Sequence, residues 1–177
     1  MAYRNGTYVA FHGQGQVNPT KSDFKYYSTM MGWKEHKHID FTFNNSHDKT
    51  YSVRDSSTWA TLSARLRERL NNSKNMVLIT TSSTPLDGDG VPFEIETAID
   101  HCEIPIIAAY PEYDQVRVID NAVRAKWPAA LKSRIDSGKA RVVHIPFKLS
   151  ALKYCINHFS HDKLPNSGKS CFTSDWS

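Results

Sequence analysis

An α/β protein with helices on both faces of a mainly parallel, five-stranded sheet is predicted by two features of the chain. Five short apolar or β-branched runs alternate with helical segments, and such alternation produces parallel strands joined by right-handed crossovers. The length of 177 residues, 40% of them apolar, is that of one domain with a substantial core, because domains commonly contain about 100–200 residues. We therefore expect a flavodoxin-like, three-layer sandwich.

The five expected strands are short runs that end at turn-forming or polar residues. Met76–Thr80 and Pro105–Tyr110 are almost continuously apolar, which is typical of strands covered on both faces. Ile39–Phe43 alternates apolar and polar residues, as a half-buried strand does. The first and last strands are expected at Thr7–His12 and Arg141–Ile145.

Helices are expected between these strands, because apolar residues recur there at spacings of three and four. The clearest helix has N-cap candidates before it and carries four apolar residues on one face: Trp59, Leu62, Leu66 and Leu70. The others are expected at Pro19–Trp33, Pro92–Cys102, Ile119–Ile135 with a break at Pro128, and Leu149–Phe159.

Composition narrows the classes of function. The 22 Lys and Arg residues against 18 Asp and Glu residues include no basic block, so a nucleic-acid partner is not expected. No apolar run approaches the ~18–20 residues of a membrane-spanning helix, and the first residues lack a signal-peptide pattern. We expect a soluble, cytoplasmic protein without a membrane partner. It should have one domain over residues 1–160, a loose C-terminal tail over residues 161–177, and three reduced cysteines.

Two patterns that could bind a cofactor or a metal are incomplete. Gly13–Gly15 lacks the third glycine of a dinucleotide loop, because Asn18 stands in that place, so a plain turn is the simpler interpretation. Two close histidine pairs have no cysteine or carboxylate at zinc spacing: His36 with His38, and His158 with His161. We expect neither a bound cofactor nor a metal site.

A candidate catalytic carboxylate follows the third expected strand. In open parallel sheets, ligands bind beyond the carboxyl ends of the strands. The loops to search are those after His12, Phe43, Thr81 and Tyr110. Glu94 lies near the start of the helix that follows the polar loop 82–90, and the stretch from Asp87 to Asp114 holds eight carboxylates and no Lys or Arg. A purely structural interpretation also fits, because the helix dipole favours a carboxylate in the first turn.

Several short motifs follow one another in an order specific enough to compare with a known family. They are Phe11-His12, Asp23-Phe24-Lys25, Trp33, Phe43 leading into Asn44–Lys49, Asn75–Ser82, and Phe93-Glu94-Ile95 with Ala98-Ile99. In this order they resemble the TIR-like family of small bacterial and archaeal proteins, the group that includes the TIR protein of the Thoeris anti-phage system. The resemblance covers roughly residues 7–110 and implies a TIR-like domain.

The resemblance implies an NAD glycohydrolase or ADP-ribosyl cyclase, with NAD as substrate and no further cofactor. TIR-type enzymes cleave the bond between nicotinamide and ribose. Nicotinamide departs as a neutral molecule, so the general acid of ordinary glycoside hydrolysis is not needed, and one carboxylate, Glu94, can stabilise the developing cation. Residues expected around the substrate are Phe11, His12, Gly13, Asn44, Ser83 and Phe93. A cyclic ADP-ribose-type product that activates a separate anti-phage effector protein, and a homo-oligomer, are also implied.

Two other functions fit the same residues. The chain could be a TIR-like interaction and signalling module without turnover, in which Glu94 is structural. It could also be a nucleoside deoxyribosyltransferase-like enzyme, which likewise uses a carboxylate at the ribose. Nicotinamide release from NAD separates the first function from these two.

Overall fold

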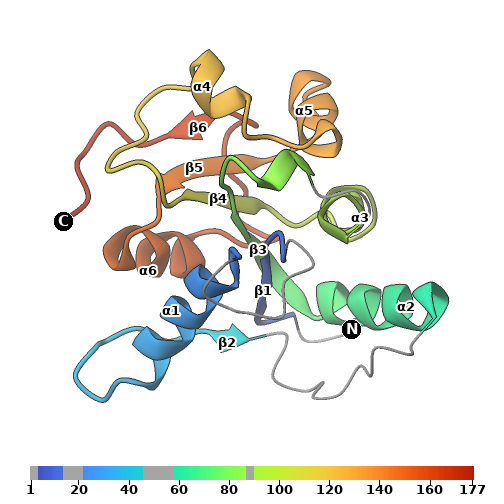
Figure 1. The fold of residues 1–177 in the computed structure, drawn as a ribbon, viewed down its shortest axis with the longest axis horizontal. Coiled ribbons are helices and arrows are strands. Elements are labelled where there is room, and N and C mark those ends of the chain that lie inside the picture. Colours follow the sequence, from blue (N-terminus) through green and yellow to red (C-terminus); the bar gives the residue numbers. More distant parts are fainter. Residues whose placement is uncertain (1–3, 14–21, 46–57, 87–89) are drawn as a thin grey trace.

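The fold is seen in a computed structural model that describes residues 4–13, 22–45, 58–86 and 90–177. Within these residues, a six-stranded sheet has the order β2-β1-β3-β4-β5-β6, and all neighbouring strands are parallel. The strands are β1 (Gly6–Ala10), β2 (Asn44–Asn45), β3 (Ser73–Ile79), β4 (Ile106–Tyr110), β5 (Val142–Pro146) and β6 (Ser170–Cys171). The predicted α/β fold with a parallel sheet is confirmed, with one strand more than the five expected (Figure 1).

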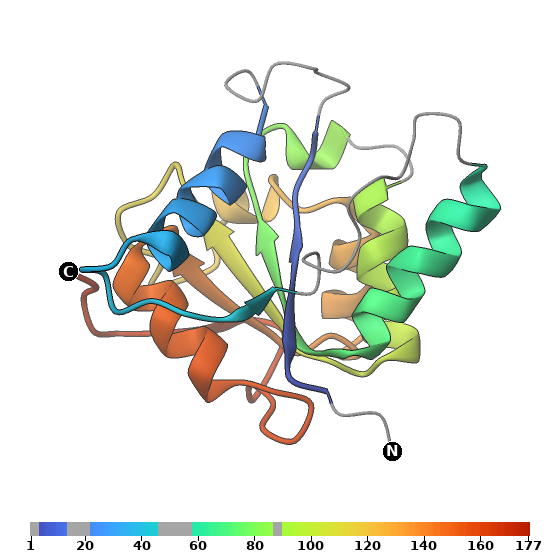
Figure 2. The same ribbon diagram turned by 90° about the horizontal axis from the view of Figure 1, so that it is seen from below.

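Helices cover both faces of the sheet, so the protein has three layers (Figures 1 and 2). On one face lie α1 (Phe24–Glu35) and α6 (Leu149–His158). On the other face lie α2 (Trp59–Asn71), α3 (Gly90–Glu96), α4 (Asn121–Arg124) and α5 (Ala129–Asp136). A π-helical turn, Thr97–His101, continues directly from α3.

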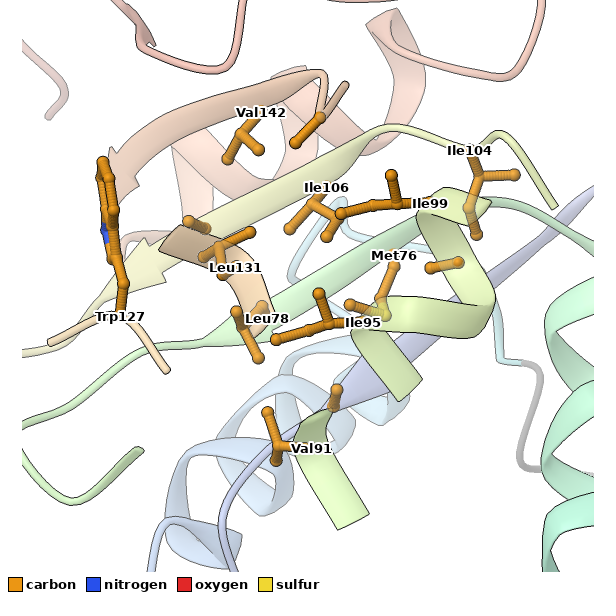
Figure 3. Close-up of a cluster of buried hydrophobic side chains, with 14 of the residues drawn as sticks. Met76, Leu78, Val91, Ile95, Ile99, Ile104, Ile106, Trp127, Leu131 and Val142 are labelled. Carbon is orange, nitrogen blue, oxygen red and sulfur yellow. The ribbon is translucent and has the colours of Figure 1, made fainter. Parts of the chain in front are cut away.

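Alternate residues of each central strand feed two separate apolar clusters. Met76 and Leu78 of β3 belong to the cluster under α2, α3 and α5, and Val77 and Ile79 belong to the cluster under α1 and α6. Figure 3 shows the first cluster, with Ile95 of α3 directed toward the sheet. Because Met76–Ile79 of β3 are covered on both faces, this part of the strand is a continuous apolar run, as predicted, and β3 begins three residues earlier, at Ser73.

One predicted strand is displaced. The expected strand Ile39–Phe43 is not part of the sheet, and the pairing begins one residue later, where Asn44 and Asn45 lie beside Gly6 and Thr7 of β1. The alternation in the sequence has a different cause. Phe41 and Phe43 are buried and the residues beside them are exposed, so alternating burial occurs here without a strand ladder.

Residues 161–177, expected to form a loose tail, contribute the sixth strand. Ser170 and Cys171 pair with Val143 and His144 at the outer edge of the sheet. A two-residue strand has no recognisable period, which explains why the sequence pattern did not reveal it. Further along the chain, the backbone carbonyl of Trp176 accepts hydrogen bonds from Gln115 and Lys148.

The predicted helices agree with the structure within a few residues. The segment Ile119–Ile135 is two helices, α4 and α5, separated at Pro128 as expected. The segment Pro19–Trp33 corresponds to α1, although its residues 19–21 lie outside the described part of the chain. Among the described residues, no helix is both long and apolar enough to cross a membrane.

Candidate functional site

Glu94 lies on α3 beside the buried face of that helix. Val91 and Ile95, four residues apart, are buried against the sheet, which leaves Glu94 partly buried at the flank of the same face. There the hydroxyl of Tyr8, from the middle of β1, donates a hydrogen bond of 2.5 Å to Glu94 Oε1. Tyr8 of the sheet therefore holds the candidate carboxylate in place.

The protonation of Tyr8 makes it a permanent donor in this pair. Its side chain is wholly buried, and burial, followed by the nearby charge of Glu94, raises the pKa of Tyr8 well above its usual 10. Arg69, in the last turn of α2, acts electrostatically in the opposite direction on the same phenol. At neutral pH the tyrosine thus remains protonated and directs its O–H at the carboxylate.

Glu96, two residues further along α3, has different surroundings. Its side chain is half exposed, and its Oε1 lies 3.8 Å from the guanidinium of Arg134 on α5. Arg134 is bound more closely by Asp100, at 2.5 Å. Glu96 is therefore turned toward α5, whereas Glu94 is turned toward β1, as expected for residues about 200° apart around a helix.

A second polar cluster joins the loop after β3 to the start of α1. Thr81 Oγ1 and Ser83 Oγ donate hydrogen bonds of 2.7 and 3.2 Å to the buried carboxylate of Asp23. Burial raises the pKa of Asp23, and the two hydroxyls and the charge of His12 oppose this shift. Two of the expected substrate residues, His12 and Ser83, are thus brought together around Asp23. The sequence shows two hydroxyl side chains in this loop, and buried hydroxyls need hydrogen-bond partners. It does not show that Asp23 is the acceptor.

A third polar cluster, at the ends of β3 and β4, consists of Ser82, Glu112 and Lys126. Glu112 Oε1 accepts from the backbone N–H of Ser82 over 2.9 Å, and Oε2 accepts from the Ser82 hydroxyl over 2.8 Å. The ammonium of Lys126 is ion-paired with Glu112 and lies 2.7 Å from Ser82 Oγ. Burial alone would raise the pKa of Glu112, but the hydrogen bonds from Lys126 and Ser82 outweigh it and lower that pKa. Lys126 and Glu112 were not among the residues expected at the site.

The aromatic candidates lie apart from one another. The ring of Phe11 stacks on Tyr27 of α1, with ring centroids 5.5 Å apart. The ring of Phe93 packs against Trp59 of α2 at 5.3 Å, and the guanidinium of Arg67 lies over it. Phe11 is thus on the α1 side of the sheet, and Phe93 lies between α2 and α3.

The two remaining candidates differ in position. Asn44 pairs with Gly6, at the amino end of β1, and is exposed. Gly13 follows the carboxyl end of β1, and a Cβ added there would meet nothing within 4 Å. Gly13 therefore lies at the edge where ligands of parallel sheets bind, and Asn44 lies toward the opposite edge. Among the described residues, no three His, Cys, Asp or Glu side chains lie close enough together to hold a metal ion.

A comparison with known protein families gives a match over most of this sheet. The family model described as "Thoeris protein ThsB, TIR-like domain" matches residues 8–116, which is more than half of the chain. The matched region begins at Tyr8 and includes Glu94 and the loop after β3, whereas Lys126 lies beyond it. The match links the chain to Thoeris defence. The chain belongs to the family of TIR-like domains found in Thoeris protein ThsB.

Proposed function

We propose that this protein cleaves the nicotinamide–ribose bond of NAD and that Glu94 is the catalytic residue. The observation that carries the proposal is the hydrogen bond from the buried phenol of Tyr8 to Glu94 Oε1. This hydrogen bond holds the carboxylate of Glu94 in place on α3, which follows the loop after β3 in a TIR-like domain. Fixed charges aimed at developing charge are a major source of catalysis, because they need no reorganisation during the reaction.

The chemistry needs one carboxylate. When the bond between C1′ of the ribose and the pyridinium nitrogen breaks, the bonding electrons leave with nitrogen and neutralise it, so no proton has to be supplied to nicotinamide. The ribose carbon becomes cationic, and Glu94 stabilises it from close range. A nucleophile then attacks C1′ and loses its proton. Water gives ADP-ribose, and a nucleophile of the same molecule gives a cyclic product.

The residues around the substrate form part of the same proposal. His12, Gly13 and Ser83 follow the carboxyl ends of β1 and β3, where strand order reverses and ligands of parallel sheets bind. Phe11 would supply an aromatic wall beside them. Phe93 and Asn44 are included on the family resemblance. Phe93 belongs to α3 and its ring packs against α2, and Asn44 belongs to β2.

We further propose a cyclic ADP-ribose-type product that activates a separate anti-phage effector protein, with activity dependent on assembly into a homo-oligomer. The family match supports a role in Thoeris defence. A diffusible nucleotide would connect this chain to an effector that it does not need to touch.

The test compares wild-type protein with Glu94→Gln and with the matched control Glu96→Gln, whose side chain is half exposed and turned toward Arg134. Each protein is incubated with NAD over a range of protein concentrations, so that assembled forms are included, and products are identified by mass spectrometry. We expect nicotinamide release from wild type and from Glu96→Gln, and a loss of about 10²–10³-fold in Glu94→Gln.

Three results would contradict the proposal. Absence of nicotinamide release at every concentration would favour a module without turnover, and transfer of deoxyribose between bases would favour a nucleoside deoxyribosyltransferase-like enzyme. Full activity in Glu94→Gln would remove Glu94 from the catalytic role.

A further inference from the structure

The proposed substrate carries a pyrophosphate, and the chain segment that carries Glu94 supplies no cation to bind it. From residue 87 to residue 114 the chain has eight carboxylates and no Lys or Arg. The hydroxyl of Ser83, in the loop after β3, lies beside the carboxylate of Asp23. A cation for the phosphates therefore has to come from another part of the chain.

Lys126 brings such a cation to the carboxyl edge of the sheet. It lies between α4 and α5, and its ammonium reaches Ser82, three residues after β3, and Glu112, two residues after β4. The order β2-β1-β3 places the reversal of strand order between β1 and β3, which is where ligands bind in such sheets. Lys126 thus contacts the loop after β3, which begins beside the place where the strand order reverses.

The position of Lys126 is fixed by its surroundings. The next residue, Trp127, is buried, and its indole N–H donates to the hydroxyl of Tyr110 over 2.8 Å. The ammonium of Lys126 lies 5.6 Å from the centre of the Tyr113 ring, and only 12% of the Lys126 side chain is exposed. A cation held this way loses little conformational freedom when it binds an anion.

Three donors converge at this place on one anionic group. They are the ammonium of Lys126, the hydroxyl of Ser82 and the backbone N–H of Ser82, and all of them contact the carboxylate of Glu112. A hydroxyl, a backbone N–H and an ammonium also form a typical phosphate-binding set. Glu112 is itself 39% exposed, so its side chain can turn into solvent when another anion takes these donors.

We propose that Ser82 and Lys126 form the binding site for the pyrophosphate of a nucleotide, and that Glu112 occupies this site as an internal competitor until the nucleotide displaces it. The identity of the nucleotide as NAD rests on the proposed function, whereas the anion site itself does not. Lowering of the Glu112 pKa by its donors agrees with an anion site.

The two members of the ion pair are expected to respond in opposite directions. Binding of ADP, which needs no turnover, is measured by calorimetry with the full chain. Lys126→Met should weaken ADP binding by about 10-fold or more, because a charge-assisted bond is lost. Glu112→Gln should tighten it by about 2–5-fold, because the partly exposed carboxylate of Glu112 no longer competes for the donors. Lys132→Met, one turn into α5, is the matched control and should leave ADP binding unchanged.

A pair with only a structural role gives a different result. Both substitutions break the same ion pair, so both would then weaken ADP binding alike or leave it unchanged, and either outcome overturns the proposal. Circular dichroism of each variant verifies that it is folded. Ser82→Ala removes one neutral donor and should weaken ADP binding to a smaller extent than Lys126→Met.

Kinetics separate this proposal from the proposed function. If NAD is cleaved, Lys126→Met should raise KM for NAD and leave kcat/KM for nicotinamide riboside unchanged, because nicotinamide riboside has no phosphate. Equal losses for both substrates would contradict the phosphate site. If NAD is not cleaved but ADP binding changes in opposite directions in the two variants, the anion site stands and the proposed function fails.

Discussion

Two buried tyrosines on the same face of the sheet end in different kinds of hydrogen-bond network. Tyr110 of β4 accepts from the indole N–H of Trp127, and its own hydroxyl lies 2.7 Å from Nδ1 of His144. The other ring nitrogen of His144 lies 2.9 Å from the carbonyl of Gly168. Tyr8 of β1 instead donates to the carboxylate of Glu94, which is partly buried on α3.

The Tyr110 network is closed and neutral. A carbonyl can only accept, so His144 Nε2 must carry the proton and Nδ1 must accept from Tyr110. Burial lowers the pKa of His144 from 6.5 to about 4, against the effect of Gly168. Every member of the network therefore has a hydrogen-bond partner, and no member is charged. The network joins β4 and β5 to the segment that precedes β6.

The Tyr8 network includes the carboxylate of Glu94, although the buried hydroxyl of Tyr8 needs only a hydrogen-bond acceptor and not a charged one. A neutral amide at position 94 could accept the same hydrogen bond without the cost of partly desolvating a carboxylate. Closed neutral networks serve stability, whereas a charge retained at a partly buried position indicates a functional site. Substitutions at His144, Tyr110 and Tyr8 test whether the two networks differ in this way.

Acid should destabilise the fold most strongly through His144. Its folded-state pKa of about 4 lies below the unfolded value of 6.5, so the unfolded chain takes up the proton first. The contribution is fully present above pH 6.5 and is lost as pH falls toward 4, by about 3 kcal/mol in total. Urea unfolding at several pH values measures it. His144→Gln should flatten the part of the curve between pH 6.5 and 4, and a curve identical to that of wild type would contradict the assignment.

Tyr110→Phe should have the next largest effect, and only on stability. Without the hydroxyl, the buried N–H of Trp127 and Nδ1 of His144 both lose their partner. The free energy of unfolding should fall by about 2 kcal/mol, the usual cost of unsatisfied buried polar groups. Denaturant unfolding gives the loss. NAD cleavage per folded molecule should be unchanged, and a lower kcat would show that the two networks do not have separate roles.

The sequence alone predicted much of the fold, because burial leaves a local pattern. Met76–Ile79 of β3 and the whole of β4 are covered on both faces and are apolar runs, and α2 shows the spacing of a helix with one buried face. The strand predicted at Ile39–Phe43 was wrong. The alternating apolar residues there reflect the burial of two aromatic rings, Phe41 and Phe43, and not strand pairing. β6 has only two residues and no pattern.

The candidate site was predicted only in part, because hydrogen-bond partners leave no local signal. Glu94 was recognisable from a short motif. Its partner Tyr8 is 86 residues away, and Lys126 is 44 residues from Ser82, so neither contact could be derived from spacing. One general signal existed for Tyr8: a tyrosine in a buried strand usually needs a partner for its hydroxyl.

Tyr8→Phe should have the smallest effect on stability and a specific effect on catalysis. The ring remains in the core and Glu94 keeps access to water, so the free energy of unfolding should fall by only about 1 kcal/mol. If Tyr8 positions Glu94, kcat for NAD should fall by about 10-fold with little change in KM, because an interaction made in the transition state is weakened. Tyr110→Phe, measured per folded molecule, is the control. If both variants lose stability and neither loses kcat, the two tyrosines have the same structural role, and the charge at Glu94 needs an explanation other than catalysis.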